Sequence, residues 1–84
     1  MRAEILLPDL QAGPATLSVW FADLGELVFE GDRLVEVLVG GATFDVPAPA
    51  TGRLVEKRVW TNDPLLPGQV LGVVEPTGDD KVTR

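Results

Sequence analysis

The sequence predicts an all-β domain, a sandwich or a barrel, and three observations support this prediction. Short runs rich in Val and Leu are bounded by Gly, Pro, Asp or Asn, which is the pattern of strands and turns. Seven prolines and nine glycines leave few windows that are long enough for a helix. The length of 84 residues fits one small domain with a single modest core.

The first three expected strands are residues 3–7, 17–22 and 34–39, and each is apolar up to a residue that ends it. The first run is Ala-Glu-Ile-Leu-Leu, which Pro8 and Asp9 end. Asp9 is expected to cap a turn, because its carboxylate can accept from nearby backbone N–H groups. The second run ends before Asp-Leu-Gly, and the third before two consecutive glycines.

The last three expected strands are residues 44–46, 54–59 and 70–75. Pro47 and Pro49 follow the first of them, and we expect them at a strand end or sheet edge because proline cannot donate to a ladder. Thr-Asn-Asp and Pro-Gly turns separate the other two.

The chain also repeats itself at an offset of 37 residues (68 minus 31). Val-Phe-Glu-Gly-Asp-Arg-Leu-Val-Glu-Val at 28–37 aligns with Leu-Leu-Pro-Gly-Gln-Val-Leu-Gly-Val-Val at 65–74, and Leu17 aligns with Leu54. A repeat of this length predicts two similar β units that pack about a pseudo-twofold axis and share one core.

Composition excludes several classes of function. The formal net charge of −6 opposes binding to nucleic acid or to anionic membranes. The chain has neither Cys nor His, so thiol chemistry and the commonest general base are absent. An enzyme is therefore the least favoured class. No apolar run approaches the roughly 20 residues of a membrane span, and no signal peptide is evident at the start, which favours a cytoplasmic protein.

Four segments, in order, resemble the lipoyl domain. They are Ile-Leu-Leu-Pro-Asp-Leu at 5–10, the Gly25 and Gly31 turns within 24–32, Val-Pro-Ala-Pro-Ala-Thr-Gly at 46–52, and Leu-Gly-Val-Val-Glu at 71–75. The resemblance covers roughly residues 4–75. It implies a flattened β-barrel of two four-stranded antiparallel sheets, which lipoyl and biotinyl domains share. We assign residues 1–76 to this domain and 77–84 to a polar C-terminal tail.

In that family a hairpin tip reads Asp-Lys-Ala or Met-Lys-Met, and the lysine carries lipoate or biotin. Here Ala42 and Thr43 match the residues after the lysine, Gly41 stands at the lysine position, and Gly40 precedes it. Leu38 replaces a Glu that is usual on the strand before the turn. Residues 34–56 contain no lysine. The Gly-Gly pair suits a type I′ hairpin, which needs φ > 0 at both positions. We therefore expect no attached cofactor.

The only two lysines lie elsewhere. Lys57 is expected on a solvated strand face. Lys81 follows Asp79-Asp80 near the symmetric copy of the tip, and we expect it in a frayed tail. Either one would have to carry the group if the chain were modified at all.

Among the aromatic residues, Trp20, Phe21 and Phe29 are expected in the core. Trp60 should point outward, where it would either anchor a partner or lean on the sheet edge. Leu65 and Leu66 are adjacent, so one of them should face out. Leu38 makes the tip apolar, which favours a contact surface there.

The preferred hypothesis is a non-catalytic protein-binding or structural module. Its partner would be a 2-oxo acid dehydrogenase-type or biotin-dependent multienzyme complex. The alternative is a swinging-arm carrier that is modified at an unusual lysine. A carrier inside an acyltransferase usually precedes a long Ala/Pro-rich linker, so the short segment after Glu75 favours a stand-alone protein or a piece of a longer chain.

Overall fold

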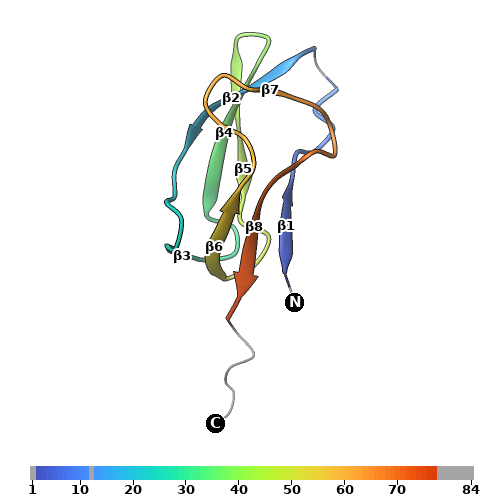
Figure 1. Ribbon diagram of the computed structural model, residues 1–84. Helices are drawn as coiled ribbons and strands as arrows, with labels where there is room; N and C mark the ends of the chain where they lie inside the picture. The colour runs from blue at the N-terminus through green and yellow to red at the C-terminus, as the bar shows by residue number, and fades with distance from the viewer. Residues whose placement is uncertain (1, 12, 78–84) are drawn as a thin grey trace.

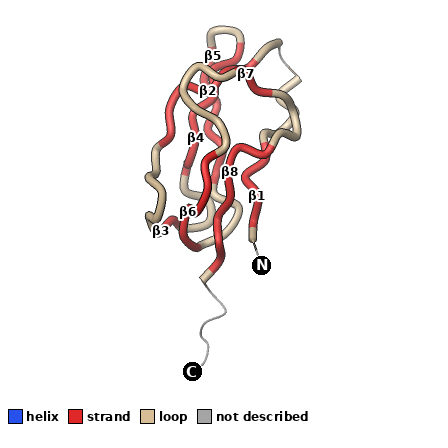
Figure 2. Tube along the Cα trace, viewed as in Figure 1, coloured by secondary structure: helices blue, strands red, loops and turns tan. Residues whose placement is uncertain are grey.

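The computed structural model describes residues 2–11 and 13–77, and these ranges form strands and turns without a helix (Figures 1 and 2). This confirms the all-β prediction. In chain order the strands are β1 Ala3–Leu6, β2 Ala15–Trp20, β3 Leu27–Val28, β4 Arg33–Val39, β5 Ala42–Pro47, β6 Gly52–Lys57, β7 Pro64–Leu65 and β8 Val70–Pro76.

The eight strands form two four-stranded sheets in which all pairs are antiparallel. One sheet has the order β1-β8-β6-β3 and the other has the order β5-β4-β2-β7. Each sheet therefore contains strands from both halves of the chain. The fold that the resemblance implied is confirmed, and Pro47 ends the edge strand β5, as expected for proline.

The two halves are related by the offset that the sequence repeat predicts. Adding 37 to the bounds of β2, β3 and β4 gives the bounds of β6, β7 and β8. The β-bulge in the pairing of β2 with β4, between Leu17 and Val19, recurs between Leu54 and Glu56 in the pairing of β6 with β8. The pseudo-twofold relation thus extends to an irregularity of the ladder.

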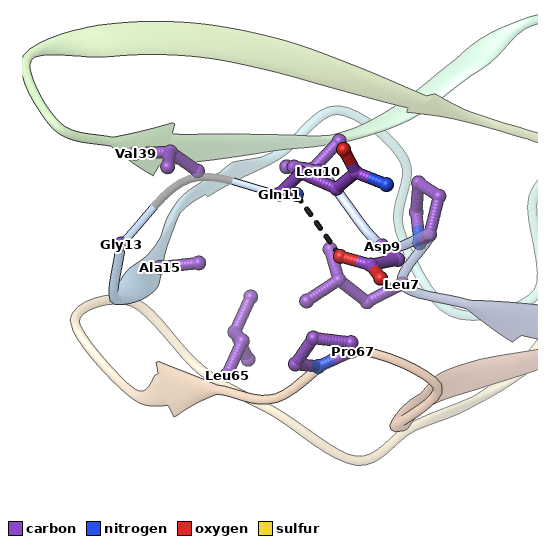
Figure 3. A pocket seen from close by; sticks show the side chains of 10 residues that line it. Leu7, Asp9, Leu10, Gln11, Gly13, Ala15, Val39, Leu65 and Pro67 are labelled. Atoms are coloured by element: carbon purple, nitrogen blue, oxygen red, sulfur yellow. Dashed lines mark hydrogen bonds between the residues drawn. The ribbon is translucent and has the colours of Figure 1, made fainter.

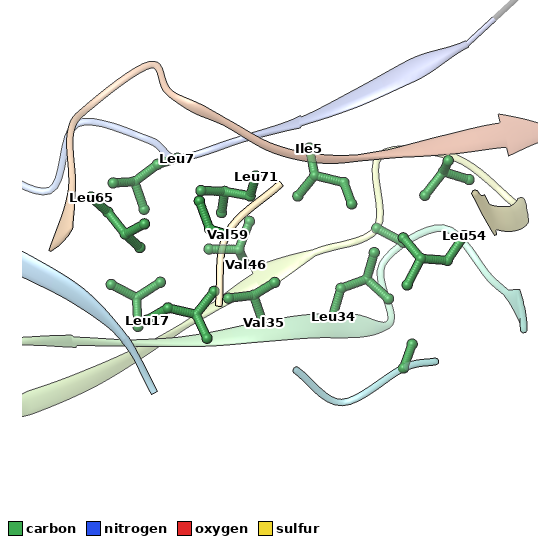
Figure 4. Packing of buried hydrophobic residues seen from close by; sticks show 14 of the residues in the cluster. Ile5, Leu7, Leu17, Leu34, Val35, Val46, Leu54, Val59, Leu65 and Leu71 are labelled. Carbon is green, nitrogen blue, oxygen red and sulfur yellow. The ribbon is translucent and has the colours of Figure 1, made fainter. Parts of the chain in front are cut away.

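One apolar core lies between the sheets (Figure 4). Leu17 and Leu54 are fully buried at equivalent positions, and so are Leu34 and Leu71. Burying a side chain of this size contributes about 1.5–3 kcal/mol. No polar or charged residue is buried in the described part of the chain. The stability of the domain therefore rests mainly on this shared core.

Two predictions about the aromatic residues are wrong. Phe21 is 38% exposed and Phe29 is 55% exposed, so neither belongs to the core. Phe29 opens a tight turn, in which its N–H donates to Asp32 Oδ2 at 3.1 Å. Phe21 follows the last residue of β2 and lies under the Arg33 guanidinium, 4.4 Å from Cζ to the ring centroid. Trp20 does pack partly buried against the core, as predicted.

Strands β3 and β7 were not among the six expected runs. Each has only two residues, and β7 begins with Pro64, which usually argues against a strand. Both strands lie at sheet edges, where a missing donor is tolerated. Leu65 is buried and Leu66 is exposed, as the adjacent pair predicted.

Candidate functional site

The tip of the β4–β5 hairpin is a two-residue loop. Val39 pairs with Ala42, which leaves Gly40 and Gly41 as the connection. Their φ angles are +55° and +85°, both positive, as the type I′ prediction required. This region is where the sequence analysis placed the functional position of the fold.

The tip offers space but no side chain. A Cβ atom added to Gly40 or Gly41 would meet nothing within 4 Å. The obstacle to a side chain here is thus the backbone conformation and not crowding. In the family that the sequence resembles, lipoate or biotin is attached to a lysine amine, and neither Gly40 nor Gly41 has one. The residues at the tip therefore do not fit a covalently held group of this kind.

The flank of the hairpin presents an uncharged row across its sheet. Leu38, 42% exposed, pairs with Thr43 on one side and with Thr16 on the other. Thr16 also pairs with Pro64 of β7. This row of Thr43, Leu38, Thr16 and Pro64 is hereafter the tip row. Its composition suits contact with another protein better than acid–base chemistry.

The next row toward the centre of the sheet is acidic. Glu36 pairs with Asp45, so the two carboxylates are adjacent. Ser18 donates its hydroxyl to Glu36 Oε2 at 2.9 Å, and Arg33 lies 3.8 Å from Asp45 Oδ2. The Ser18 hydroxyl thus satisfies one Glu36 oxygen, and the Arg33 guanidinium offsets part of the Asp45 charge. The site thus combines an apolar side chain at the tip with carboxylates one step behind it.

A cavity of about 140 Å³ lies beside the tip end of the hairpin, at Val39 (Figure 3). Leu7, Ala15, Val39 and Leu65 form its apolar walls, and Asp9 lies near its polar edge. Asp9 Oδ1 accepts from the Gln11 N–H at 3.0 Å, which confirms the predicted turn cap. Among the described residues, the walls of this cavity offer mainly apolar contact, and the Asp9 carboxylate at its edge already accepts from the Gln11 N–H.

The sequence analysis missed this cavity, although the repeat contained a signal for it. The connection between β1 and β2 spans residues 7–14, eight residues, whereas the connection between β5 and β6 spans residues 48–51, four residues. The connection between β1 and β2 is thus twice as long as its counterpart in the other half, and it borders the cavity.

Trp60 is exposed, as predicted, with 56% of its surface accessible. It lies in the loop between β6 and β7, where its backbone N–H donates to Asp63 Oδ2 at 2.8 Å. The same loop is held to β2, because the Asn62 N–H donates to Leu17 O at 2.8 Å. Trp60 thus lies in a loop next to β7 and Leu38 in strand β4 of the hairpin, and β2 lies between β7 and β4 in the sheet.

Lys57 is not on a freely solvated face, so that prediction needs correction. It is the last residue of β6, is half-buried, and places its Nζ 5.1 Å from the centroid of the Trp20 ring. The aromatic face attracts the ammonium and holds it against the barrel. Lys81 lies outside the described residues.

The shifted pKa values belong to a surface pair remote from the tip. Arg58 Nε donates to Glu56 Oε2 at 2.8 Å, and this hydrogen bond lowers the pKa of the Glu56 carboxyl. The same bond raises the pKa of the Arg58 guanidinium. Within residues 2–11 and 13–77, no cluster of acidic side chains could hold a metal ion, and no helix could cross a bilayer.

Comparison with known proteins gives two informative matches. The chain is 36% identical over 77 residues to the dihydrolipoyllysine-residue succinyltransferase component of the 2-oxoglutarate dehydrogenase complex from Bartonella vinsonii subsp. berkhoffii. That alignment covers 89% of this chain but only 19% of the relative, so the chain spans about a fifth of its length.

The second match is structural. The NMR structure of the lipoyl domain of the 2-oxoglutarate dehydrogenase complex from Azotobacter vinelandii superimposes with a TM-score of 0.70 at 25% identity. The match covers 88% of this chain and 98% of that domain. No protein-family model matches the chain.

Proposed function

This chain is homologous to lipoyl domains, and we propose that it acts as a protein-binding module that carries neither lipoate nor biotin. The observation that supports this proposal most directly is the hairpin. It has a two-residue turn with positive φ at both positions, and the sequence resemblance assigns Gly41 to the position of the family's lysine. A module of this kind would act through its surface and would not itself be an enzyme.

The tip row and Trp60 are the proposed contact residues. Leu38 projects from β4 next to a turn that contributes no bulk, so a partner can approach it closely. The proposed partner is an enzyme component of a multienzyme complex. A 2-oxo acid dehydrogenase complex is favoured over a biotin-dependent one, since both matched proteins are named as parts of a 2-oxoglutarate dehydrogenase complex.

The alternative function is a swinging-arm carrier that is modified at another lysine. Lys57 suits this role poorly, because it ends a strand in the body of the barrel and packs on Trp20. A group attached there would lose the free reach that an exposed hairpin tip provides. Lys81 is the other lysine that could carry the group, and the mass measurement described next tests both lysines.

The deciding experiment is the intact mass of the protein purified from its native cells. The proposal expects the mass of the bare chain. A mass increased by a lipoyl or biotinyl group, located by peptide mapping to Lys57 or Lys81, would overturn the proposal in favour of the carrier.

Binding is tested separately by titrating the chain with the purified 2-oxo acid-decarboxylating component of such a complex. We expect Leu38→Ser to weaken binding by about tenfold, the effect of losing one buried apolar anchor. The matched control is Leu6→Ser, which removes a similarly exposed leucine from β1 in the other sheet and should have no effect. Equal weakening by both variants would contradict the role of the tip row.

A further inference from the structure

The end of the barrel opposite the hairpin has an exposed apolar surface formed by residues 21–33, here called the β3 surface. It includes β3 and the turns on both sides of it, which Figure 1 shows at the lower end of the molecule, away from the hairpin. Four of the nine large exposed apolar side chains in the described chain belong to this segment of thirteen residues: Phe21, Leu24, Leu27 and Phe29. Such a concentration is typical of an interaction site.

The β3 surface is hollowed as well as apolar. An open depression of about 390 Å³ is lined by Phe21, Ala22, Glu26, Val28, Asp32, Arg33 and Leu34. The one cation on its wall is already engaged, because Arg33 lies over the Phe21 ring at 4.4 Å and 3.8 Å from Asp45. The depression therefore presents apolar walls and carboxylates to an incoming group.

The charge of this surface is strongly one-sided. Its segment contains four carboxylates, namely Asp23, Glu26, Glu30 and Asp32, against the single cation Arg33. Among the described residues, none of these four carboxylates forms an ion pair within 4.0 Å. Arg53, on the neighbouring strand, directs its guanidinium to the backbone oxygen of Gly25 at 3.2 Å. The β3 surface thus keeps an uncompensated negative charge.

The pseudo-twofold copy of this segment, residues 58–70, shows which of these features the fold requires. The Asp23 N–H donates to Glu26 Oε1 in one half, and the Trp60 N–H donates to Asp63 Oδ2 in the other. The second turn also has the same hydrogen bond in both halves, because the Phe29 N–H donates to Asp32 and the Leu66 N–H donates to Gln69. The backbone therefore needs one side-chain oxygen per turn.

The remaining charge is not needed for that backbone. Gln69 performs the task of Asp32 without a charge, and Asp23 and Glu30 correspond to Trp60 and Pro67. The copy contains one acidic residue, Asp63, and one basic residue, Arg58. The β3 surface contains four acidic residues and one basic residue. The same backbone is thus built with and without the excess negative charge.

We propose that the β3 surface binds a segment of a partner protein in which lysine or arginine residues flank a large apolar side chain. The apolar side chain would enter the depression beside Phe21, and the cations would face Asp23 and Glu30. Complementary charge around an apolar anchor gives both orientation and affinity. This inference does not depend on the hairpin or on the proposed function, since it uses the opposite end of the molecule.

The test uses a synthetic peptide of about seven residues that alternates Lys and Leu, added to the ¹⁵N-labelled chain. We expect amide shift changes concentrated in residues 21–33. Binding should weaken by about tenfold for Leu24→Ser/Phe29→Ser, because this variant removes exposed apolar contact area from the β3 surface. Asp23→Asn/Glu30→Gln should weaken binding similarly, because it removes the complementary charge. Added salt should weaken binding of the unaltered chain.

The chain provides its own matched control. Leu6→Ser/Leu66→Ser removes two exposed leucines outside residues 21–33, one of them from the turn equivalent to that of Phe29, and should leave binding unchanged. A peptide with Glu in place of Lys should not bind. Shift changes in residues 58–70, or spread evenly over the surface, would overturn the proposal, and so would equal affinity for all variants. The unshifted amide signals report whether each variant is folded.

Discussion

Trp20 and Lys57 occupy equivalent positions in the two halves of the chain, and they contact each other. Position 57 is position 20 plus the 37-residue offset, and the Lys57 ammonium lies 5.1 Å from the centroid of the Trp20 ring. The indole Nε1 of Trp20 also donates to the Val59 backbone oxygen at 2.9 Å. One side chain thus joins β2 of one sheet to the end of β6 in the other.

Replacing Trp20 with Leu should lower the free energy of unfolding by about 2–4 kcal/mol. The variant loses apolar contact area and leaves the Val59 carbonyl without its donor. Urea denaturation followed by far-UV circular dichroism measures this change. Trp60→Leu is the control and should cost less than about 0.5 kcal/mol, because Trp60 is largely exposed. Equal losses for the two variants would show that Trp20 has no special role in joining the sheets.

Gly72→Ala should destabilise the domain by about 2–3 kcal/mol. The added Cβ would collide with the Glu56 backbone oxygen and would lie 3.0 Å from Cη2 of Trp20. Gly13→Ala adds the same methyl group where nothing lies within 4 Å, and it should be nearly neutral. The midpoints of thermal unfolding compare the two variants. A stable Gly72→Ala protein would mean that β6 and β8 can separate at little cost.

A lysine placed at the tip should create an acceptor for lipoate. In the double variant Gly40→Asp/Gly41→Lys, the turn carries the Asp-Lys-Ala sequence that relatives display. Incubation with a lipoate–protein ligase, lipoate and ATP, followed by mass spectrometry, measures the modification. The control is Gly68→Lys, which has a nearly identical φ of +82° and open space around it but lies outside the hairpin. Modification of the control alone would contradict the assignment of Gly41 to the lysine position.

The single variants Gly41→Lys and Gly68→Lys should lose stability to a small and similar extent. A positive φ costs a residue with a Cβ about 1–2 kcal/mol, and neither position adds a steric clash. Urea denaturation should therefore place Gly41→Lys and Gly68→Lys within about 1 kcal/mol of each other. Collapse of the hairpin variant alone would show that its tip requires glycine for a reason beyond φ.

The Glu56 carboxyl should titrate below its ordinary range and should move upward in Arg58→Gln. The folded pKa is lowered by the Arg58 hydrogen bond, then by the charges of Arg58 and Arg2. Any stability from this pair is present above the unfolded pKa and is lost as pH falls through the folded pKa. Side-chain carboxyl NMR follows the titration. Arg33→Gln removes a cation that pairs with Asp45 and should leave Glu56 unchanged.

Much of the fold could be predicted because the two halves of the sequence repeat the same pattern of strands and turns at an offset of 37 residues. The repeat fixed the relation of β2 to β6 and of β4 to β8, and the paired glycines indicated the hairpin. The two-residue strands could not be predicted, since their pairing is set by the β2 and β6 neighbours and not by a local pattern. The prediction that Phe29 is buried was wrong because it rested on hydropathy, which does not report that Phe29 opens a tight turn and points outward there.

The candidate site was predictable at the tip and less so around it. The turn at Gly40 and Gly41 follows from the glycine pair, whereas the roles of Gly41 and Leu38 were inferred from the family resemblance and stay predictions. The cavity beside Val39 depends on a loop that folds back onto β7, and no short motif specifies such a contact. The packing of Lys57 on Trp20 joins two sheets, so neither strand considered alone could reveal it.

The interleaved strand order has a consequence for how the chain folds. β1 pairs only with β8, so the register that joins Ala3 to Val74 closes a loop of nearly the whole chain. Such distant pairing must wait for the intervening strands, which makes folding slow for a domain of this size. During synthesis β1 leaves the ribosome before β8, the strand with which it pairs. Until β8 has emerged, the sheet β1-β8-β6-β3 cannot close over the core, and the net charge of −6 is the feature that opposes aggregation of the exposed apolar side chains.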